Sequence, residues 1–246
     1  VTLSKYVSDC MDKEGKFRGL GYIIKTTMYC AVPTVLVMMQ PDFGTAFVFI
    51  CIMVFIYFIG RISWGYILTA AGGLAVCMPL AYYFVLSDSQ RERIDVFINP
   101  ESDLQNSGYN VAQSKIAIGS GQLTGKGFFS EGTLAQLRFV PERHTDFIFA
   151  GIVEGLGFVG GTIIICLFFA LIFRWIYIAM RTKDSFGTCL VVGVAGMFTA
   201  HVFENIGMTI GLMPVTGIPL PFISYGGSNL LTNLIGVGIV ENVWMR

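Results

Sequence analysis

Apolar stretches with few charged residues alternate with polar segments along the whole chain. A run of about 18 or more apolar residues is typical of a transmembrane helix. Because lipid offers no hydrogen-bond partners, a helix, which satisfies its own backbone, is the expected form of such a run. The pattern therefore predicts an all-α, polytopic transmembrane protein with about six membrane-spanning helices, at residues 21–39, 44–60, 64–86, 146–178, 186–211 and 228–244.

A polar segment, residues 87–145, separates the third apolar stretch from the fourth. We interpret residues 1–246 as one transmembrane domain and this segment as a long loop outside the membrane. The stretch 146–178 is longer than a bilayer requires, so we expect its helix to tilt or to protrude. The first residue is Val1 rather than Met, and we expect the chain to begin inside a longer protein.

Positive charges are distributed unevenly between the two predicted sides of the membrane. Short cytoplasmic segments of membrane proteins carry an excess of Lys and Arg. With the N-terminus in the cytoplasm, ten of the 16 basic residues are cytoplasmic: Lys5, Lys13, Lys16, Arg18, Lys25, Arg61, Arg174, Arg181, Lys183 and Arg246. The short outer turns, residues 40–43 and 212–227, contain none. The distribution predicts cytoplasmic ends for this chain and an extracytoplasmic loop.

Composition argues against several classes of function. Hydrophobic residues make up 54% of the chain, charged residues make up 13%, and the formal net charge is +0. A neutral chain offers no basic surface for nucleic acid, so we expect no nucleic-acid partner. The 6 cysteines form no CxxC pair, and the 2 histidines have no metal-ligand spacing. We therefore expect neither a disulfide framework nor a metal or cofactor held by the protein alone.

The second outer turn, residues 211–228, is apolar and uncharged but rich in proline and glycine. Pro219 is one of its prolines, and Ser224 lies near its end. Such a composition forbids a regular helix. Irregular backbone at membrane depth is tolerated where it packs against protein or lines a cavity. Either a rigid loop or a cavity lining fits this turn.

Within the long loop, residues 108–119 predict a short amphipathic helix, because Tyr109, Ala112 and Ile116 fall on one face. The run Gly119-Ser-Gly121-Gln-Leu-Thr-Gly125-Lys-Gly127 follows it. This run lacks the glycine and hydroxyl positions of a nucleotide-binding loop. Its backbone amides could bind an anion, or its glycines could simply give flexibility.

The end of the loop, Pro141-Glu-Arg-His-Thr-Asp-Phe-Ile-Phe149, leads into the fourth apolar stretch. Thr145 suits the N-cap of that helix, which would place Asp146 in its first turn. There the helix dipole favours an ionised carboxylate. Asp146, next to Arg143 and His144, could act as a general base, or it could only stabilise the helix.

Three further ionisable residues fall inside predicted spans: Glu154, His201 and Glu204. Ionisable groups at membrane depth are candidates for function. Glu154 lies eight residues, or roughly 12 Å along a helix, beyond Asp146. Glu204 and its neighbour Asn205 lie within reach of the proline-rich turn, where a hydrogen-bonding role and a catalytic role are both open.

Several motifs together resemble the SEDS family (shape, elongation, division, sporulation). They are Gln40-Pro-Asp-Phe-Gly-Thr45, Phe97-Ile-Asn-Pro-Glu101, Gly108-Tyr-Asn, Gln113-Ser-Lys-Ile-Ala-Ile-Gly-Ser-Gly121, Pro141-Glu-Arg-His-Thr-Asp-Phe-Ile-Phe149, Pro214-Val-Thr-Gly-Ile-Pro-Leu-Pro-Phe222 and Ser224-Tyr-Gly-Gly-Ser228. The likeness runs in order over nearly the whole chain. Within the family, Gly217-Ile-Pro-Leu-Pro-Phe222 and Asn205-Ile-Gly-Met208 are more similar to the elongation member than to the division member.

The resemblance implies a ten-helix protein of the bacterial inner membrane, of which this chain would be helices 5 to 10. It implies polymerisation of lipid II into glycan strands, and it maps the family's essential loop aspartate onto Asp146. Transfer from an α-linked pyrophosphate to a β-1,4 linkage inverts the sugar, so a base must take the proton of the attacking hydroxyl. Gly155 follows Glu154 where members often have a second acid, which weakens any argument from an acid pair.

The leaving undecaprenyl pyrophosphate needs positive charge. Residues assigned to substrate binding are Arg93, Lys115, Lys126, Glu142, Arg143 and His144, and structural or cavity roles go to Glu154, Glu204, Pro219 and Ser224. A divalent cation could assist through the pyrophosphate.

The implied partners are lipid II, the nascent glycan strand, the lipid bilayer, the elongation machinery and a class B penicillin-binding protein. A flippase that moves lipid II across the membrane is the rival function. A third candidate function is a scaffold that recruits the class B penicillin-binding protein, which is a transpeptidase. This function is compatible with catalysis.

Overall fold

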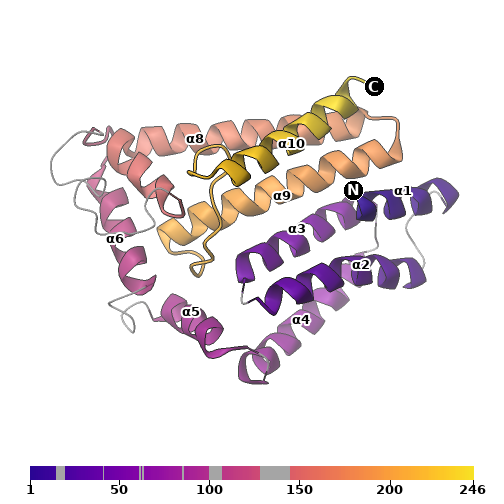
Figure 1. Ribbon diagram of the computed structural model, residues 1–246, viewed down its shortest axis with the longest axis horizontal. Coiled ribbons are helices and arrows are strands. Elements are labelled where there is room, and N and C mark those ends of the chain that lie inside the picture. Colours follow the sequence, from indigo (N-terminus) through magenta and orange to yellow (C-terminus); the bar gives the residue numbers. More distant parts are fainter. Residues whose placement is uncertain are drawn as a thin grey trace. The chain divides into compact units, whose positions relative to one another are not determined.

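The computed structural model describes residues 1–14, 20–40, 42–60, 62, 64–84, 86–99, 107–127 and 145–246. Within these ranges the chain forms helices and no strand (Figure 1). The helices are α1 (Thr2–Glu14), α2 (Leu20–Met38), α3 (Phe43–Ile59), α4 (Trp64–Phe84), α5 (Asp88–Ile98), α6 (Ser107–Ser120), α8 (Ile148–Arg181), α9 (Ser185–Ile210) and α10 (Gly227–Trp244). The all-α fold predicted from the sequence is confirmed.

The six apolar stretches correspond to α2, α3, α4, α8, α9 and α10. Long apolar runs of this kind are a strong sequence signal for helices. Among the described residues, three helices are long and apolar enough to cross a membrane: Gly21–Met38, Ile148–Arg181 and Ser185–Ile210. The apolar helix Phe43–Ile59 is shorter. The presence of membrane-spanning helices is therefore supported, whereas the number of about six spans stays a prediction.

The polar segments contain helices as well. The helix predicted at 108–119 is confirmed as α6, whose buried face is Val111, Ser114 and Ala117. The predicted apolar face is not the buried one, since Ala112 and Ile116 are exposed.

Two other helices, α1 and α5, were not predicted, because their polar composition indicates segments outside the membrane. In α1 the apolar residues Leu3, Tyr6, Val7 and Cys10 nevertheless recur at helical spacing and form one face. Residues Thr2–Glu14 and Asp88–Ile98 thus show that polar composition does not exclude a helix.

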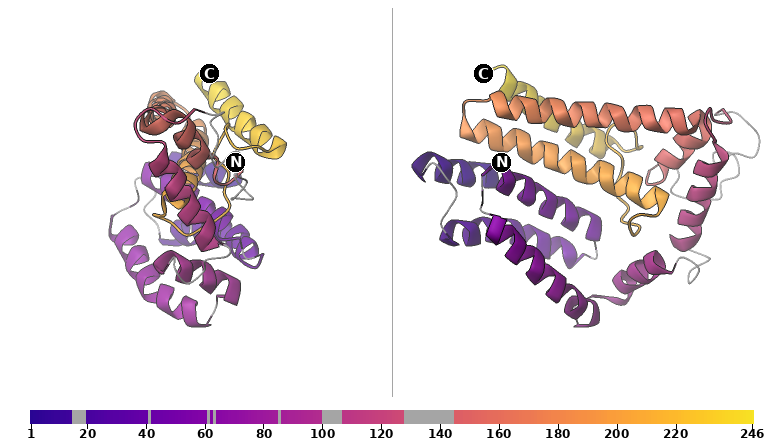
Figure 2. Two further views of the ribbon diagram at one scale, coloured as in Figure 1. Left: turned by 90° about the vertical axis from the view of Figure 1, so that its left-hand side faces the viewer. Right: turned by 180° about the vertical axis from the view of Figure 1, so that it is seen from behind.

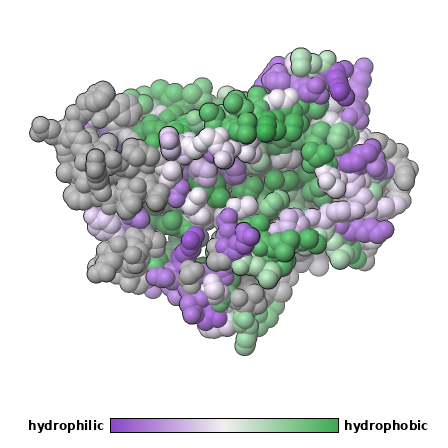
Figure 3. All heavy atoms as spheres, viewed as in Figure 1, coloured by the Kyte–Doolittle hydropathy of each residue, from purple (hydrophilic) through white to green (hydrophobic). Residues whose placement is uncertain are grey.

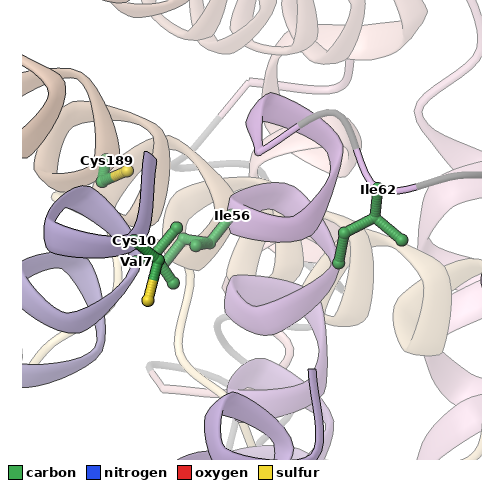
Figure 4. Close-up of a cluster of buried hydrophobic side chains, with 5 residues drawn as sticks. All are labelled: Val7, Cys10, Ile56, Ile62 and Cys189. Carbon is green, nitrogen blue, oxygen red and sulfur yellow. The ribbon is translucent and has the colours of Figure 1, made fainter. Parts of the chain in front are cut away.

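The chain divides into two compact units. The first contains residues 1–91, 174–197 and 237–246, and the second contains residues 92–173 and 198–236. In the first unit, Val7 and Cys10 of α1 pack with Ile56 of α3 (Figure 4). Buried apolar contacts of this kind explain why the polar helix α1 is stable next to α3.

The second unit contains all the sequence-predicted site residues that the structure describes. Its core includes Phe149, Val153 and Phe168 of α8 together with Leu220 of the proline-rich segment. Helices α8 and α9 run side by side in opposite directions, as Figure 1 and the right-hand view of Figure 2 show. Large apolar side chains of α8 face outward, such as Leu167 with 64% and Phe173 with 66% exposure, and hydrophobic surface covers the region of α8 (Figure 3). This outward apolar surface suits a lipid environment.

Candidate active site

Asp146 lies in a turn formed by residues 145–147, just before α8 begins at Ile148. The backbone N–H of Ala150 donates to the Phe147 carbonyl over 3.1 Å, so the first hydrogen-bonded turn of α8 begins at Phe147. The expected N-cap role of Thr145, with Asp146 in the first helical turn, is therefore wrong. Phe147 explains the difference, because it is only 1% exposed and packs with Val111 and Ala117 of α6, so the chain turns inward before the helix starts.

The proline-rich segment, which we define as residues 211–226, is fixed to this turn by two side chains. The Asn205 side-chain amide of α9 donates to the carbonyls of Asp146, over 2.9 Å, and of Ile218, over 2.8 Å. The Ser224 hydroxyl donates to the Thr145 carbonyl over 2.6 Å and accepts from the Leu220 amide over 2.8 Å. Pro219 lies between the two anchored residues, 218 and 220. The segment thus packs against protein, while its role as a cavity lining stays a prediction.

The Asp146 carboxylate faces the same segment. Gly217 has a positive φ of 77°, and a Cβ atom added there would lie 3.5 Å from Oδ2 of Asp146. A positive φ is strained for any side chain but costs glycine little. Asp146 is itself half-buried. The glycine therefore allows the backbone of the segment to lie directly beside the carboxylate.

Two of the predicted pyrophosphate-binding cations lie together. Arg93 of α5 and Lys115 of α6 line one small cavity of about 20 Å³ with residues 213–215. The Arg93 guanidinium donates to the Val215 carbonyl over 3.1 Å, and the side chain of Lys115 passes over Gly211. The buried Ser114 hydroxyl of α6 also donates to the Thr209 carbonyl of α9 over 2.8 Å. The polar segment 87–145 is thus tied to the proline-rich segment by its described helices.

The glycine run 119–127 packs against a break in α8. Gly157 adopts φ 71° and ψ −173°, which interrupts the helix. Backbone hydrogen bonds cross the break, from Lys126 N to Glu154 O over 2.9 Å and from Phe158 N to Gln122 O over 2.8 Å. Cβ atoms added at Gly125 or Gly157 would overlap the opposite backbone. Close backbone approach, rather than mere flexibility, is therefore the role of these glycines.

The third predicted cation, Lys126, lies at this break and not at the Arg93 cavity. Its ammonium is 3.8 Å from Oε1 of Glu154, and the Ser120 hydroxyl is 3.4 Å from the same oxygen. The Glu154 side chain is 5% exposed and that of Lys126 is 40% exposed. A buried carboxylate is costly unless it is paired. Lys126 thus compensates Glu154, a contact that the sequence did not indicate.

Of the remaining site candidates, some are buried and others lie outside the residues that the structure describes. Glu204 of α9 is 0% exposed and precedes the equally buried Asn205. Glu142, Arg143 and His144 lie outside the described residues. The described part of the chain contains no group of three His, Cys, Asp or Glu side chains that could hold a metal ion.

The whole chain, residues 1–246, matches the family model FTSW_RODA_SPOVE, described as cell cycle protein. The chain belongs to this family. The resemblance to the SEDS family is thereby confirmed, and FtsW, RodA and SpoVE proteins are the relatives against which the site is compared.

Curated relatives share a large part of the sequence. Peptidoglycan glycosyltransferase MrdB of Escherichia coli K12 is 45% identical over 212 residues, which are 86% of this chain and 57% of MrdB. Stage V sporulation protein E of Bacillus subtilis is 42% identical over 215 residues, which are 85% of this chain and 56% of that protein. The chain thus spans somewhat more than half the length of these relatives.

Solved structures have the same fold. RodA of Thermus thermophilus gives a TM-score of 0.64 at 26% identity, covering 99% of this chain and 62% of RodA. A chain from a structure titled "Structural coordination of polymerization and crosslinking by a peptidoglycan synthase complex" gives a TM-score of 0.80 at 27% identity. That match covers 99% of this chain and 67% of the other.

Proposed function

We propose that the complete protein containing this chain polymerises peptidoglycan glycan strands from lipid II during cell elongation, with Asp146 as the general base. The position of Asp146 carries the proposal. Its half-buried carboxylate lies beside Gly217 in front of α8, and the buried Asn205 and Ser224 fix the backbone on both sides. The name peptidoglycan glycosyltransferase of the 45% identical MrdB supports this class of reaction.

In the proposed reaction, the 4-hydroxyl oxygen of one sugar attacks the anomeric carbon of another. The bond from that carbon to the pyrophosphate oxygen breaks, and the α-linkage becomes a β-linkage. The hydroxyl proton passes to the Asp146 carboxylate. A position just before the N-terminus of α8 favours the ionised form of this carboxylate, which is the form that accepts a proton.

Undecaprenyl pyrophosphate leaves with its negative charge, and cations placed where that charge develops would stabilise the transition state. Arg93 and Lys115 are the best supported candidates, because they line one cavity next to the proline-rich segment. Lys126, Arg143, Glu142 and His144 stay further candidates for substrate contact. A divalent cation carried by the pyrophosphate would add positive charge.

The proposed location is the bacterial inner membrane, with the segment 87–145 outside and both ends of this chain in the cytoplasm. The proposed partners are the nascent strand, the elongation machinery and a class B penicillin-binding protein. The neighbour with a TM-score of 0.80 comes from a peptidoglycan synthase complex, which supports such a partnership.

A lipid II flippase is the rival function, because Glu154 and Glu204 are buried polar groups inside the helices α8 and α9. The test compares the complete wild-type protein, assembled with its transpeptidase, in two assays. We expect glycan strands from lipid II in detergent, and we expect Asp146→Asn to abolish them. Lipid II translocation without any strand synthesis by the wild-type protein would reject the polymerase and favour the flippase.

A further inference from the structure

A basic pocket lies at the end of the molecule where α8 ends, α9 begins and α10 ends. Its volume is about 310 Å³, at the lower end of the range of ligand pockets. Arg181, Lys183 and Arg246 line it, together with the aromatic side chains Phe186 and Trp244. Hydrophilic surface gathers at this end, at the upper right of Figure 3, directly beside hydrophobic surface. None of the residues assigned to the transfer reaction belongs to this pocket.

The basic side chains of the pocket outnumber its carboxylates, three against one. Its acidic residue, Asp184, caps α9 by accepting the backbone N–H groups of Phe186 over 3.3 Å and Gly187 over 2.9 Å. Across the part of the chain that the structure describes, no carboxylate forms an ion pair with the three basic side chains. Clustered cations without a protein counter-ion attract an anionic ligand.

Stacked aromatic rings hold the wall of the pocket in place. The guanidinium of Arg174 lies 4.9 Å from the ring centre of Trp244 and 5.6 Å from that of Tyr177. The guanidinium of Arg181 lies 5.1 Å from the same tyrosine ring. Stacking orients an arginine through its face and leaves its N–H groups in the plane free for a bidentate contact with phosphate. The contact with Tyr177 restrains the exposed side chain of Arg181 beside the pocket, where its guanidinium can meet a phosphate-like group.

The surroundings indicate that the anion is a lipid headgroup. Helices α8 and α9 are both long and apolar enough to cross a membrane, and the pocket lies where they meet. Aromatic side chains such as Tyr177 and Trp244 at the ends of spans are typical of the membrane interface. The same end of α8 exposes Met180 to 67%, which offers apolar surface for an acyl chain. Basic pockets between transmembrane helices bind anionic headgroups.

We propose that this pocket binds the phosphate headgroup of an anionic phospholipid, such as phosphatidylglycerol. Arg181 and Lys183 contact the phosphate, and the ring of Trp244 borders the glycerol region. Binding at this site connects the turn between α8 and α9 with the end of α10, and so ties the protein to the charged leaflet on that side of the membrane.

Native mass spectrometry of the complete protein in detergent, titrated with phosphatidylglycerol or phosphatidylcholine, tests the proposal. We expect tighter binding of phosphatidylglycerol, and an affinity about tenfold or more weaker in the double variant Arg181→Gln/Lys183→Gln, since each basic residue near the headgroup contributes. Lys25→Gln is the matched control, because Lys25 is an exposed cation of α2 that does not line the pocket. The lipid affinity of this variant should equal that of the wild type.

Two further measurements keep the test decisive. Arg181→Lys retains the charge without the planar guanidinium, so an intermediate loss of affinity supports the proposal even if the double variant fails to fold. Glycerol phosphate in large excess should not displace the lipid, whereas full displacement would assign the pocket to a free anion. Equal affinity for both phospholipids, or equal loss in Lys25→Gln and the double variant, would overturn the proposal.

Discussion

Asn205 and Ser224 hold the candidate site together at the level of single residues. Each side chain connects the turn before α8 with the proline-rich segment, across sequence separations of 59 and 79 residues. The sequence singles out Asp146 as a candidate because a charged residue beside the start of an apolar helix is conspicuous. The bridging role of Asn205 and Ser224 could not, because it depends on which distant carbonyls the fold brings within reach.

The Ser224 hydroxyl allows a direct test of this bridge. Ser224→Ala leaves the Thr145 carbonyl and the Leu220 amide without their partner, at a cost of about 1–3 kcal/mol for such a buried group. We expect a lower temperature of thermal unfolding in detergent and slower polymerisation. Ser228→Ala is the control, because Ser228 is exposed at the start of α10. Equal unfolding temperatures of the two variants would contradict the bridge.

Among the secondary-structure elements, α8 differs most from its sequence prediction, because it is broken at Gly157. Hydropathy predicts the ends of the six apolar helices to within a few residues of the observed ends. It nevertheless predicts α8 as one continuous helix that tilts or protrudes because it is longer than a bilayer requires. Several glycines lie close together in this part of the sequence, including Gly155, Gly157 and Gly160. Their composition does not tell which one adopts a positive φ, since that choice is fixed by the backbone of the glycine run 119–127 packed against it.

Substitution of Gly157 tests this break. Gly157→Ala introduces a Cβ atom where the Leu123 carbonyl lies and forces a conformation that non-glycine residues avoid, which costs of order 1–3 kcal/mol. We expect a clear loss of thermal stability in detergent. Gly151→Ala on the same helix is the control variant, because a Cβ atom at that position meets nothing within 4 Å. If both variants unfold at the wild-type temperature, the break does not carry the packing described.

At the level of the whole molecule, the distribution of Lys and Arg predicts which side of the membrane each segment faces. Single cysteines in a cysteine-free background test this prediction in intact cells. A membrane-impermeant maleimide should label Glu92→Cys, on the exposed surface of α5, and should not label Lys183→Cys, between α8 and α9. The opposite labelling pattern would invert the proposed orientation and place Asp146 on the wrong side for strand synthesis.

The general-base role of Asp146 is the central claim, and the kinetics of Asp146→Asn test it most directly. In the complete protein with its proposed transpeptidase partner, we expect the rate of strand synthesis from lipid II to fall about 10²–10⁴-fold, the usual contribution of a general base. The affinity of Asp146→Asn for lipid II should change little, since asparagine keeps the shape of the side chain. The control variant Asp88→Asn, on the same polar segment, should retain the wild-type rate. Strand synthesis by Asp146→Asn at the wild-type rate would contradict the account.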